Sequence, residues 1–451
     1  MWRIADRPTG LMSDLYHPDA AYISWRTGRN APTTFDLYVR TAPFGGAYML
    51  VAGLELALEF VRNFGYSEED IAYLRQIRDY DEWFLKELGA LRFTGEIMAM
   101  PEGSIAFPNE PLLRITAPFR EALLLESGLL NNISASTLIA TKAARIVQAA
   151  QGRSVAEFAL RRVAEPFIVA RSASIGGCTT TSFVAAAKTF RLRATGTMPH
   201  ALVQLFDSER DAFQAVAESF NRYTFLLDTY DIERAIHTAV EVARDVQQRL
   251  GHTLAAVRLD SGDLDAGSRC CRRVLDEAGL HDVRILASSD LDEYKIQELL
   301  EVGAPVDGFG VGTTFAFAGA LGAVYKEVWY QDGSPMGDAK IKLAGEKTTW
   351  PGRKEVYRIG AFEEDVIQLE TEPRPLNGTR LLRPVMFGDE LLPGSQPPLS
   401  EIWELASVNL ARLPDKYKTI TGAEPYPVRF SEGLQHLRRR ASEHYGPSNG
   451  D

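Results

Sequence analysis

Cysteine is scarce in this sequence, and its few cysteines are badly placed for cross-linking or metal binding. Of the three cysteines in 451 residues, Cys270 and Cys271 are adjacent and Cys178 stands alone. Such spacing gives neither a disulfide framework nor a zinc-ligand pattern. We therefore expect a protein of a reducing compartment without a cysteine-based metal site.

Long hydrophobic runs are also missing. The longest apolar stretch, residues 47–61, contains Glu55 and Glu59, which excludes a membrane-spanning helix there. Residues 1–9 are polar and charged and lack the apolar segment of a signal peptide. These absences predict a cytoplasmic protein without a membrane partner.

An excess of basic residues is lacking as well. The 49 Lys and Arg residues are outnumbered by 60 Asp and Glu residues, for a net charge of −11 and a pI near 5.3. This balance argues against a nucleic-acid partner. It is compatible with phosphorylated small molecules, because local arginines and helix N-termini bind them in acidic proteins too.

The length and composition predict a globular protein of two domains. Hydrophobic residues make up 45% and charged residues 24%, which are ordinary globular values. Residues 1–125 mix elements: a strand over 34–40, helical periodicity over 48–64 and hairpin-like strands over 95–107. No internal repeat or low-complexity segment is found.

From residue 126 onward the pattern becomes an alternation of strands and helices. It opens with an Ala-rich helix over 134–150, for which Ser134 is the expected N-cap. We then expect strands over 190–195, 254–259, 283–287 and 306–311, and helices over 234–249, 264–278 and 292–301. This alternation indicates a parallel sheet, closed or doubly wound, over 126–325. Residues 326–451 form a third segment, with short strands over 326–392, a helix over 433–445 and a frayed end.

Two motifs place reactive side chains where predicted strands end. Gly196-Thr197-Met198-Pro199-His200 follows one strand, and Arg258-Leu259-Asp260-Ser261-Gly262-Asp263 follows another. The carboxyl ends of parallel strands are where α/β barrels keep their chemistry, so we predict an active site at this rim.

His200 by itself is more often a structural hydrogen-bonding group, but Asp228 strengthens a catalytic interpretation. Asp228 follows the apolar pair Leu226-Leu227 at another expected strand end. A carboxylate on one imidazole nitrogen fixes the tautomer and leaves the other nitrogen nucleophilic. Asp228 can also cap the helix that follows, and both roles are compatible.

The second motif offers an anion-binding guanidinium next to carboxylates. Alternation along an extended chain sends Arg258 and Asp260 to the same side. The guanidinium can bind a carboxylate or phosphate bidentately, while Asp260 can bind Mg²⁺ or accept ribose hydroxyls. Asp263 suits a turn into the next helix. For this hexapeptide taken alone, a buried Arg–Asp pair with an Asp N-cap is the favoured interpretation.

Two further strand ends complete the rim. Ser288-Ser289-Asp290 opens a helix with short hydroxyls and a carboxylate, although simple capping accounts for it too. The glycine-rich segment 308–314 can bring backbone N–H groups close to a phosphate, and it is neither a Walker A motif nor a Rossmann fingerprint. Its place after a late strand matches the phosphate site of (β/α) barrels.

Taken in order, these motifs resemble the nicotinate phosphoribosyltransferase family from about residue 10 to about residue 360. The matching stretches are Ser13-Asp14-Leu15-Tyr16, Phe35 to Arg40, Glu157 to Arg162, Gly196 to His200, Asp228 to Asp231, Arg258 to Leu264, Ser289 to Glu293, Gly310 to Thr313, Lys342-Leu343, Lys347 and Pro351 to Lys354.

The resemblance implies an α/β fold: an irregular (β/α) barrel with an N-terminal α+β sandwich domain completed by segments after the barrel. It implies a homodimer with shared active sites and an ATP-dependent, ligase-class enzyme that uses Mg²⁺. The reaction would join nicotinate to 5-phosphoribosyl 1-diphosphate through a phosphohistidine. A relative that uses nicotinamide or quinolinate, or a non-catalytic binding paralogue, are the alternatives.

The resemblance also implies roles for individual residues. His200 would be phosphorylated, and Asp228 would orient it. Thr197 and Arg258 would bind nicotinate, while Phe158 and Tyr16 of the neighbouring subunit would stack on its ring. Arg161 and Asp260 would lie next to the ribose, and Gly310, Gly312 and Thr313 would surround the 5′-phosphate. Asp263 and Ser288 are further candidates for substrate binding.

Simpler interpretations exist for some of these positions. Phe158 and Tyr16 could be core aromatics, and Lys342 and Lys354 could be solvated surface charges. Residues 180–183 depart from the usual family pattern; within them Ser182 stands where a nicotinamide-using relative has Asp, which favours nicotinate.

Overall fold

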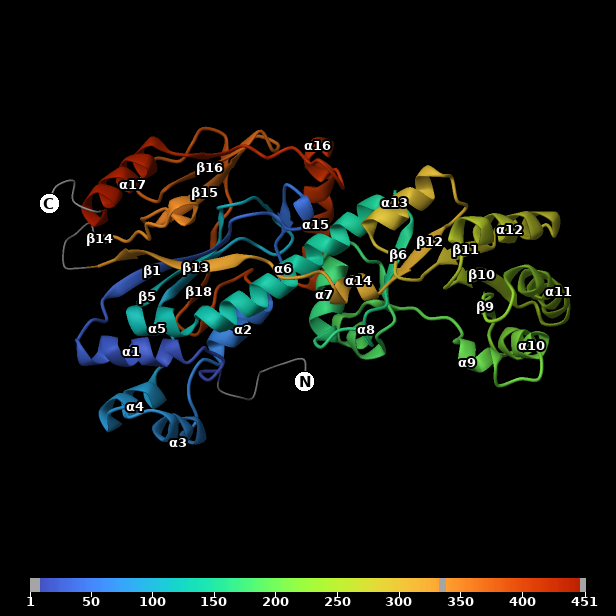
Figure 1. Cartoon of the computed structure of the whole chain (residues 1–451), viewed down its shortest axis with the longest axis horizontal. Helices are drawn as coiled ribbons and strands as arrows, with labels where there is room; N and C mark the ends of the chain where they lie inside the picture. Colours follow the sequence, from blue (N-terminus) through green and yellow to red (C-terminus); the bar gives the residue numbers. More distant parts are fainter. Residues whose placement is uncertain (1–8, 332–337, 447–451) are drawn as a thin grey trace. The chain divides into compact units, whose positions relative to one another are not determined.

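The computed structural model describes residues 9–331 and 338–446, which divide into two compact units (Figure 1). One unit contains the described residues up to Thr141 and from Ala320 onward, and the other is Lys142–Gly319. The sequence predicted boundaries at 125/126 and 325/326. The predictions for residues 1–8 and 447–451 lie outside the described residues.

The first unit is built on a seven-stranded sheet that contains strands from both the N-terminal and the C-terminal parts of the chain. All neighbouring strands pair antiparallel. The order is β14 (Asp338–Ala339), β13 (Ala323–Tyr330), β1 (Pro32–Val39), β5 (Pro111–Pro118), β3 (Glu96–Ala99), β18 (Arg383–Phe387) and β19 (Glu390–Leu391). Segments after the barrel thus complete the N-terminal sheet, as predicted.

Two smaller sheets belong to the same unit. They are a four-stranded sheet of β17 (Gly378–Arg380), β15 (Lys354–Ile359), β16 (Glu364–Leu369) and β20 (Val428–Phe430), and a pair of β2 (Met49–Leu50) and β4 (Ile105–Ala106). The predicted hairpin over 95–107 is therefore wrong, because β3 pairs with β5 and β18 while β4 pairs with β2.

The first unit also contains helices. They are α1 (Tyr16–Arg26), α2 (Leu54–Arg62), α3 (Glu68–Ile77), α4 (Glu82–Ala90), α5 (Phe119–Leu124), α15 (Leu399–Arg412), α16 (Asp415–Lys418) and α17 (Glu432–Tyr445), with 3₁₀ turns at Pro43–Gly45 and Gly345–Lys347. The predicted helix over 48–64 is shorter than expected because Met49–Leu50 pairs as a strand. The sequence pattern also missed α15 and α16.

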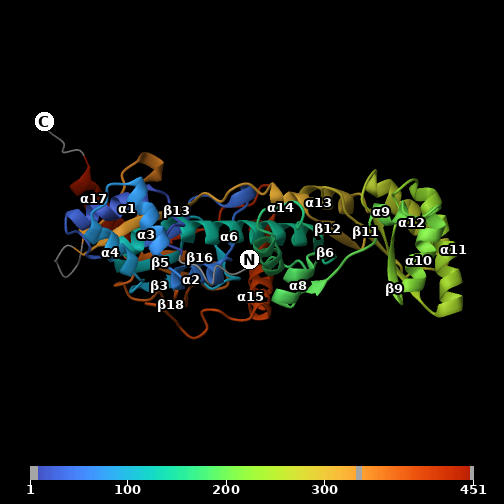
Figure 2. The same cartoon turned by 90° about the horizontal axis from the view of Figure 1, so that it is seen from below.

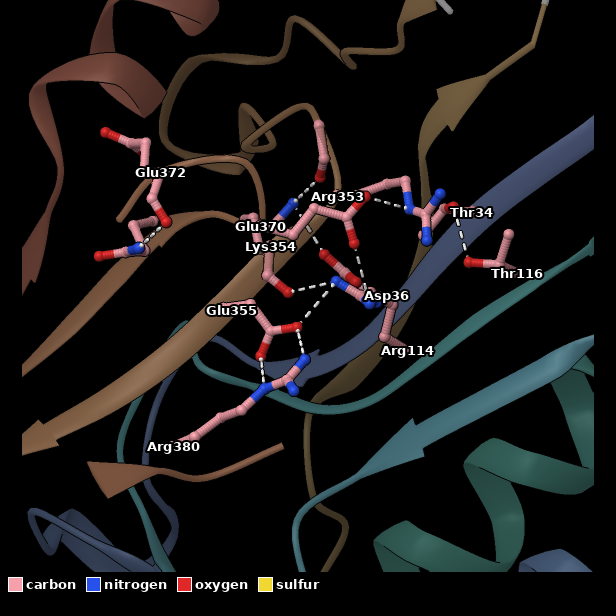
Figure 3. A network of polar contacts seen from close by, with 12 residues as sticks. Thr34, Asp36, Arg114, Thr116, Arg353, Lys354, Glu355, Glu370, Glu372 and Arg380 are labelled. Atoms are coloured by element: carbon pink, nitrogen blue, oxygen red, sulfur yellow. Dashed lines mark hydrogen bonds and ion pairs between the residues drawn. The ribbon is translucent and has the colours of Figure 1, made fainter. Parts of the chain in front are cut away.

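A buried network of charges joins the two larger sheets of this unit (Figure 3). Lys354 Nζ of β15 lies 2.7 Å from Asp36 Oδ2 of β1, and both side chains are almost fully buried. Arg114 of β5 lies 3.5 Å from Glu355 and 3.2 Å from Glu370. Burial lowers the pKa of Lys354, and the Asp36 carboxylate counteracts it. Lys354 is therefore a buried structural cation and not a solvated surface charge.

The second unit is built on a seven-stranded parallel sheet that forms a half-barrel, which confirms the α/β fold class. The order is β8 (Arg193–Ala194), β7 (Thr180–Thr181), β6 (Ser154–Glu157), β12 (Gly308–Val311), β11 (Arg284–Ala287), β10 (Thr253–Leu259) and β9 (Arg222–Leu226).

Helices alternate with these strands. They are the end of α6 (Glu126–Ala149), α7 (Pro166–Ile175), α8 (Val184–Phe190), α9 (His200–Val203), α10 (Glu209–Ser219), α11 (Ile232–Leu250), α12 (Leu264–Glu277), α13 (Glu293–Glu301) and α14 (Thr313–Ala316). Two predictions fail here. Ser134 lies inside α6 rather than at its start, and Phe190 ends α8 rather than beginning a strand.

The apolar faces of amphipathic helices determine where the core of this half-barrel lies. Along α11, buried apolar side chains recur at the spacing of one helical face. Asp231, and not Asp228 as the sequence suggested, caps its first turn by accepting from the Arg234 N–H at 2.8 Å, and Gly251 ends the helix at a φ of 75°. Figures 1 and 2 show α10, α11 and α12 packed beside β9, β10 and β11, where a continuous apolar cluster lies.

None of the helices in the described residues is long and apolar enough to cross a membrane.

Removing the carboxylate of Asp36 should destabilise the first unit. Asp36→Asn leaves the buried Lys354 ammonium without its counter-ion, and we expect a loss on the order of 3 kcal/mol in the free energy of unfolding. All six tryptophans lie in the first unit's share of the chain, so urea unfolding followed by tryptophan fluorescence measures this unit selectively.

The matched control is Glu82→Gln, which breaks an exposed pair with Arg75 and should leave the unfolding midpoint nearly unchanged. Equal effects of the two substitutions would contradict the structural role given to Asp36.

Candidate active site

The carboxyl ends of the half-barrel strands bring most of the predicted site residues together. Phe158 follows β6, Asp260 follows β10 and Ser288 follows β11. Thr197 and Arg258 join Phe158 and Ser288 around a cavity of about 190 Å³, and Gly310 of β12 lies in its wall. A second, more open cavity of about 240 Å³ shares Phe158, Arg258, Ser288 and Gly310 with the first. The first is called the enclosed cavity below and the second the open cavity.

Arg258 is the centre of the hydrogen-bond network in this site. Its Nε donates to Ser288 Oγ at 2.8 Å and its Nη1 donates to Thr197 Oγ1 at 2.9 Å. Its Nη2 lies 2.7 Å from Asp260 Oδ1. The predicted Arg–Asp pair therefore exists, and it is part of a site wall rather than an isolated structural pair.

Asp260 is held in its charged form by this network. Burial alone would raise the pKa of its carboxyl, but a 2.5 Å hydrogen bond from Ser288 and the charge of Arg258 outweigh that effect and leave the pKa below its usual value. Asp260 is therefore ionised at neutral pH. The Ser288 hydroxyl thus accepts a hydrogen bond from Arg258 and donates one to Asp260.

His200 begins the short helix α9 with its side chain 41% exposed. Its Nδ1 is 3.1 Å from Thr229 Oγ1 and its Nε2 is 3.9 Å from Asp260 Oδ2. Asp228 instead accepts hydrogen bonds from the Asp260 N–H at 3.1 Å and from the Ser261 hydroxyl. The orienting role of Asp228 toward His200 stays a prediction, whereas its contact with the turn after β10 is observed.

The open cavity is rich in arginine. Its lining comprises Phe158, Arg161, Arg162, Arg258, Asp260, Ser288, Ser289, Asp290, Gly310, Gly312 and Thr313. Ser289 and Asp290 have φ values of 107° and 38°, which are unusual for residues with side chains. Such a polar concavity with clustered guanidinium groups suits phosphate groups.

Asp263 lies at the start of α12, where its carboxylate accepts from the Ala266 N–H at 3.0 Å. Gly262, at a φ of 76°, makes the turn before it. The capping interpretation of the sequence therefore holds for Asp263, and substrate contact stays a prediction.

Two other predicted positions are not part of either cavity lining. Tyr16 is the first residue of α1 in the first unit, with 58% of its surface exposed, so it is not a core aromatic. Ser182 donates its backbone N–H to the Glu157 carbonyl at 2.9 Å, while Thr179 and Thr180 line the enclosed cavity in its place. The effect of Ser182 on base choice is untested.

Sequence reasoning missed several side chains in or next to this site, among them Glu157, Arg193 and Arg284. Glu157, 2% exposed, accepts a 2.5 Å hydrogen bond from Thr181 Oγ1 and another from the Ala159 N–H. Burial raises the pKa of Glu157, and these hydrogen bonds counteract it. Arg193 and Arg284 line the enclosed cavity. The sequence signal available for Glu157 was a carboxylate at the end of an apolar strand. No sequence pattern marks the two arginines as site residues.

Within residues 9–331 and 338–446, no three His, Cys, Asp or Glu side chains come together as a metal-binding group.

Comparison with known proteins identifies the family. A nicotinate phosphoribosyltransferase of Mycobacterium tuberculosis is 38% identical over 435 residues, which cover 94% of this chain and 92% of the relative. This chain belongs to the nicotinate phosphoribosyltransferase family. The Bacillus subtilis nicotinate phosphoribosyltransferase is 39% identical over 461 residues, covering 95% and 94% of the two chains. Residues 11–134 match the family model of the nicotinate phosphoribosyltransferase N-terminal domain.

The fold agrees with that membership. The crystal structure of human nicotinic acid phosphoribosyltransferase superimposes with a TM-score of 0.84 at 29% identity, covering 95% of this chain and 99% of the human one. A nicotinate-nucleotide pyrophosphorylase of Pyrococcus furiosus superimposes with a TM-score of 0.73 at 25% identity, covering 89% and 95%. The family resemblance and fold class inferred from the sequence are thereby confirmed.

Proposed function

We propose that this protein transfers the 5-phosphoribosyl group of 5-phosphoribosyl 1-diphosphate to nicotinate, forming nicotinate mononucleotide and diphosphate for NAD biosynthesis. The observation that carries this proposal is the meeting of two unlike cavities at Phe158 and Arg258. The enclosed one offers an aromatic ring and a cation, as a pyridine carboxylate requires. The open one offers guanidinium groups for phosphates.

Arg258 is the proposed partner of the nicotinate carboxylate. A guanidinium carries five N–H donors, and contacts with Thr197, Ser288 and Asp260 use three of them. The remaining donors are available to an incoming carboxylate. Since Arg258 is already fixed in place, it would bind that carboxylate without first losing side-chain freedom.

Asp260 is the proposed stabiliser of the transition state. As the C1–O bond to diphosphate breaks and the pyridine nitrogen attacks C1, positive charge develops on the ribose. The depressed pKa of Asp260 keeps its carboxylate negative beside that charge. Arg161 and Arg162 would hold the phosphates in the open cavity.

Mg²⁺ is the metal that we propose for this reaction. In phosphate-binding sites Mg²⁺ is usually held by one or two carboxylates together with substrate phosphates. Asp260 and Asp290, which line the open cavity, provide a donor set of this kind. When bound, the ion would neutralise charge on the departing diphosphate.

ATP is the proposed co-substrate, and His200 is the residue that would carry its phosphoryl group. Nδ1 lies 3.1 Å from Thr229 Oγ1, and in the tautomer in which Nδ1–H donates to that oxygen the lone pair is on Nε2. That nitrogen would attack the γ-phosphorus of ATP, forming an N–P bond as the bond to ADP breaks, and water would later cleave the N–P bond. The charge of the phosphorylated histidine next to Asp260 would couple this step to the open cavity.

The base preference of the purified protein tests the main reaction. With 5-phosphoribosyl 1-diphosphate, we expect kcat/KM for nicotinate to exceed that for nicotinamide on the order of 100-fold, because only the acid forms a charge-assisted pair with Arg258. Nicotinate mononucleotide is measured by chromatography, with and without ATP and with quinolinate as a third base. Arg258→Gln should lose the preference; equal use of both bases by the unaltered protein would contradict the assignment.

His200→Ala tests the coupling to ATP. We expect this variant to lose ATP hydrolysis and the stimulation by ATP, while slow ATP-independent transfer remains, because the base and ribose contacts are intact. The readouts are release of inorganic phosphate and formation of nicotinate mononucleotide. His281→Ala is the control, because His281 is exposed and distant from His200 in the sequence. Unchanged ATP hydrolysis in His200→Ala would refute the phosphohistidine.

A homodimer with shared sites is proposed from the family resemblance and from the exposure of Tyr16. Mixing Tyr16→Ala with His200→Ala subunits should restore activity, because one site of each mixed dimer then contains neither lesion. Up to about half of the mixed-dimer sites should recover. Absence of recovery despite measured subunit exchange would mean that Tyr16 does not act in the neighbouring site.

A further inference from the structure

Gly310 leaves a space in the wall of the site that the Phe158 ring fills. A Cβ atom on Gly310 would lie 2.4 Å from Cε2 and 2.7 Å from Cδ2 of that ring. Both distances are far inside van der Waals contact. Gly310 is in register with Ala156 of β6, so the ring that follows β6 lies across the backbone of β12.

The backbone of Phe158 is fixed on both sides of this contact. Its N–H donates to the Val311 carbonyl at 2.7 Å, and a Cβ atom on Gly312 would lie 2.6 Å from its carbonyl oxygen. The buried Glu157 carboxylate ties the same turn to Thr181. If the space next to Gly310 were filled, the ring would have to move by rotation of its own side chain.

Arg258 contacts the ring from another direction. Its guanidinium carbon lies 5.7 Å from the centroid of the Phe158 ring, within the range of a cation–π contact. Arg258 is itself held by Thr197, Ser288 and Asp260. The ring therefore lies between a rigid cation and a bare strand, and its orientation is determined by both.

We propose that Gly310 is a positioning residue for binding of the aromatic base, because its missing side chain sets the position of the Phe158 ring on which that base stacks. This role differs from the contact with the 5′-phosphate that the family resemblance implied for Gly310. It rests on the proposed function, since the base is the nicotinate of that reaction.

A double-mutant cycle tests this role. In the unaltered background, Gly310→Ala should raise the KM for nicotinate roughly tenfold or more and change the KM for 5-phosphoribosyl 1-diphosphate by less than about twofold. In a Phe158→Ala background, the same substitution should add less than about twofold, because the ring that it displaces is gone. Gly322→Ala is the control, since a Cβ atom there meets nothing within 4 Å.

Three results would overturn the proposal: an undiminished effect of Gly310→Ala in the Phe158→Ala background, an effect confined to 5-phosphoribosyl 1-diphosphate, or an unaffected KM for nicotinate. If Gly310→Ala alone does not fold, the double variant should fold, and its failure to do so counts against the ring contact. A crystal structure of Gly310→Ala without substrates gives a readout independent of activity. A displaced Phe158 ring supports the proposal even if nicotinate is not the substrate, and an unmoved ring refutes it.

Discussion

The guanidinium of Arg258 is the interaction on which the candidate site depends. One side chain, placed near the end of β10, binds Thr197 after β8, Ser288 after β11 and Asp260 in its own motif. Because these partners follow different strands, their convergence requires the register of the parallel sheet. Without Arg258, the half-buried Asp260 carboxylate would lose the charge that helps to keep its pKa low.

The first unit uses buried charges in a comparable way. Asp36 and Arg114 come from two strands that precede residues 142–319 in the sequence, and Lys354 and Glu355 come from one strand, β15, that follows them. A buried cation is stable only where a counter-ion lies next to it, whereas apolar contacts tolerate small shifts in position. We infer that these pairs help to specify how the two sheets face one another, in addition to their contribution to stability.

The glycine-rich strand β12 serves packing as well as chemistry. Cβ atoms at Gly308, Gly310 and Gly312 would meet Ser154, the Phe158 ring and the Phe158 carbonyl respectively. The alternate spacing of these glycines follows the period of a strand, so the Cβ positions of Gly308 and Gly310 lie on the same face of the sheet. A glycine-rich segment that reads as a phosphate loop is therefore also the surface that receives the neighbouring strand and its aromatic ring.

The sequence by itself determined the alternation of strands and helices in the second unit, the cap at Asp263, and the strand ends that carry Arg258, Asp260 and Ser288. These follow from local periodicity and from polar residues at the tips of apolar runs. Only the tertiary structure decided that Thr229 lies within hydrogen-bond distance of His200, that Lys354 is buried against Asp36, and that β3 and β4 do not pair with one another. Each of these depends on which distant segments pack together, and local patterns carry no information about contacts that only the assembled sheets create.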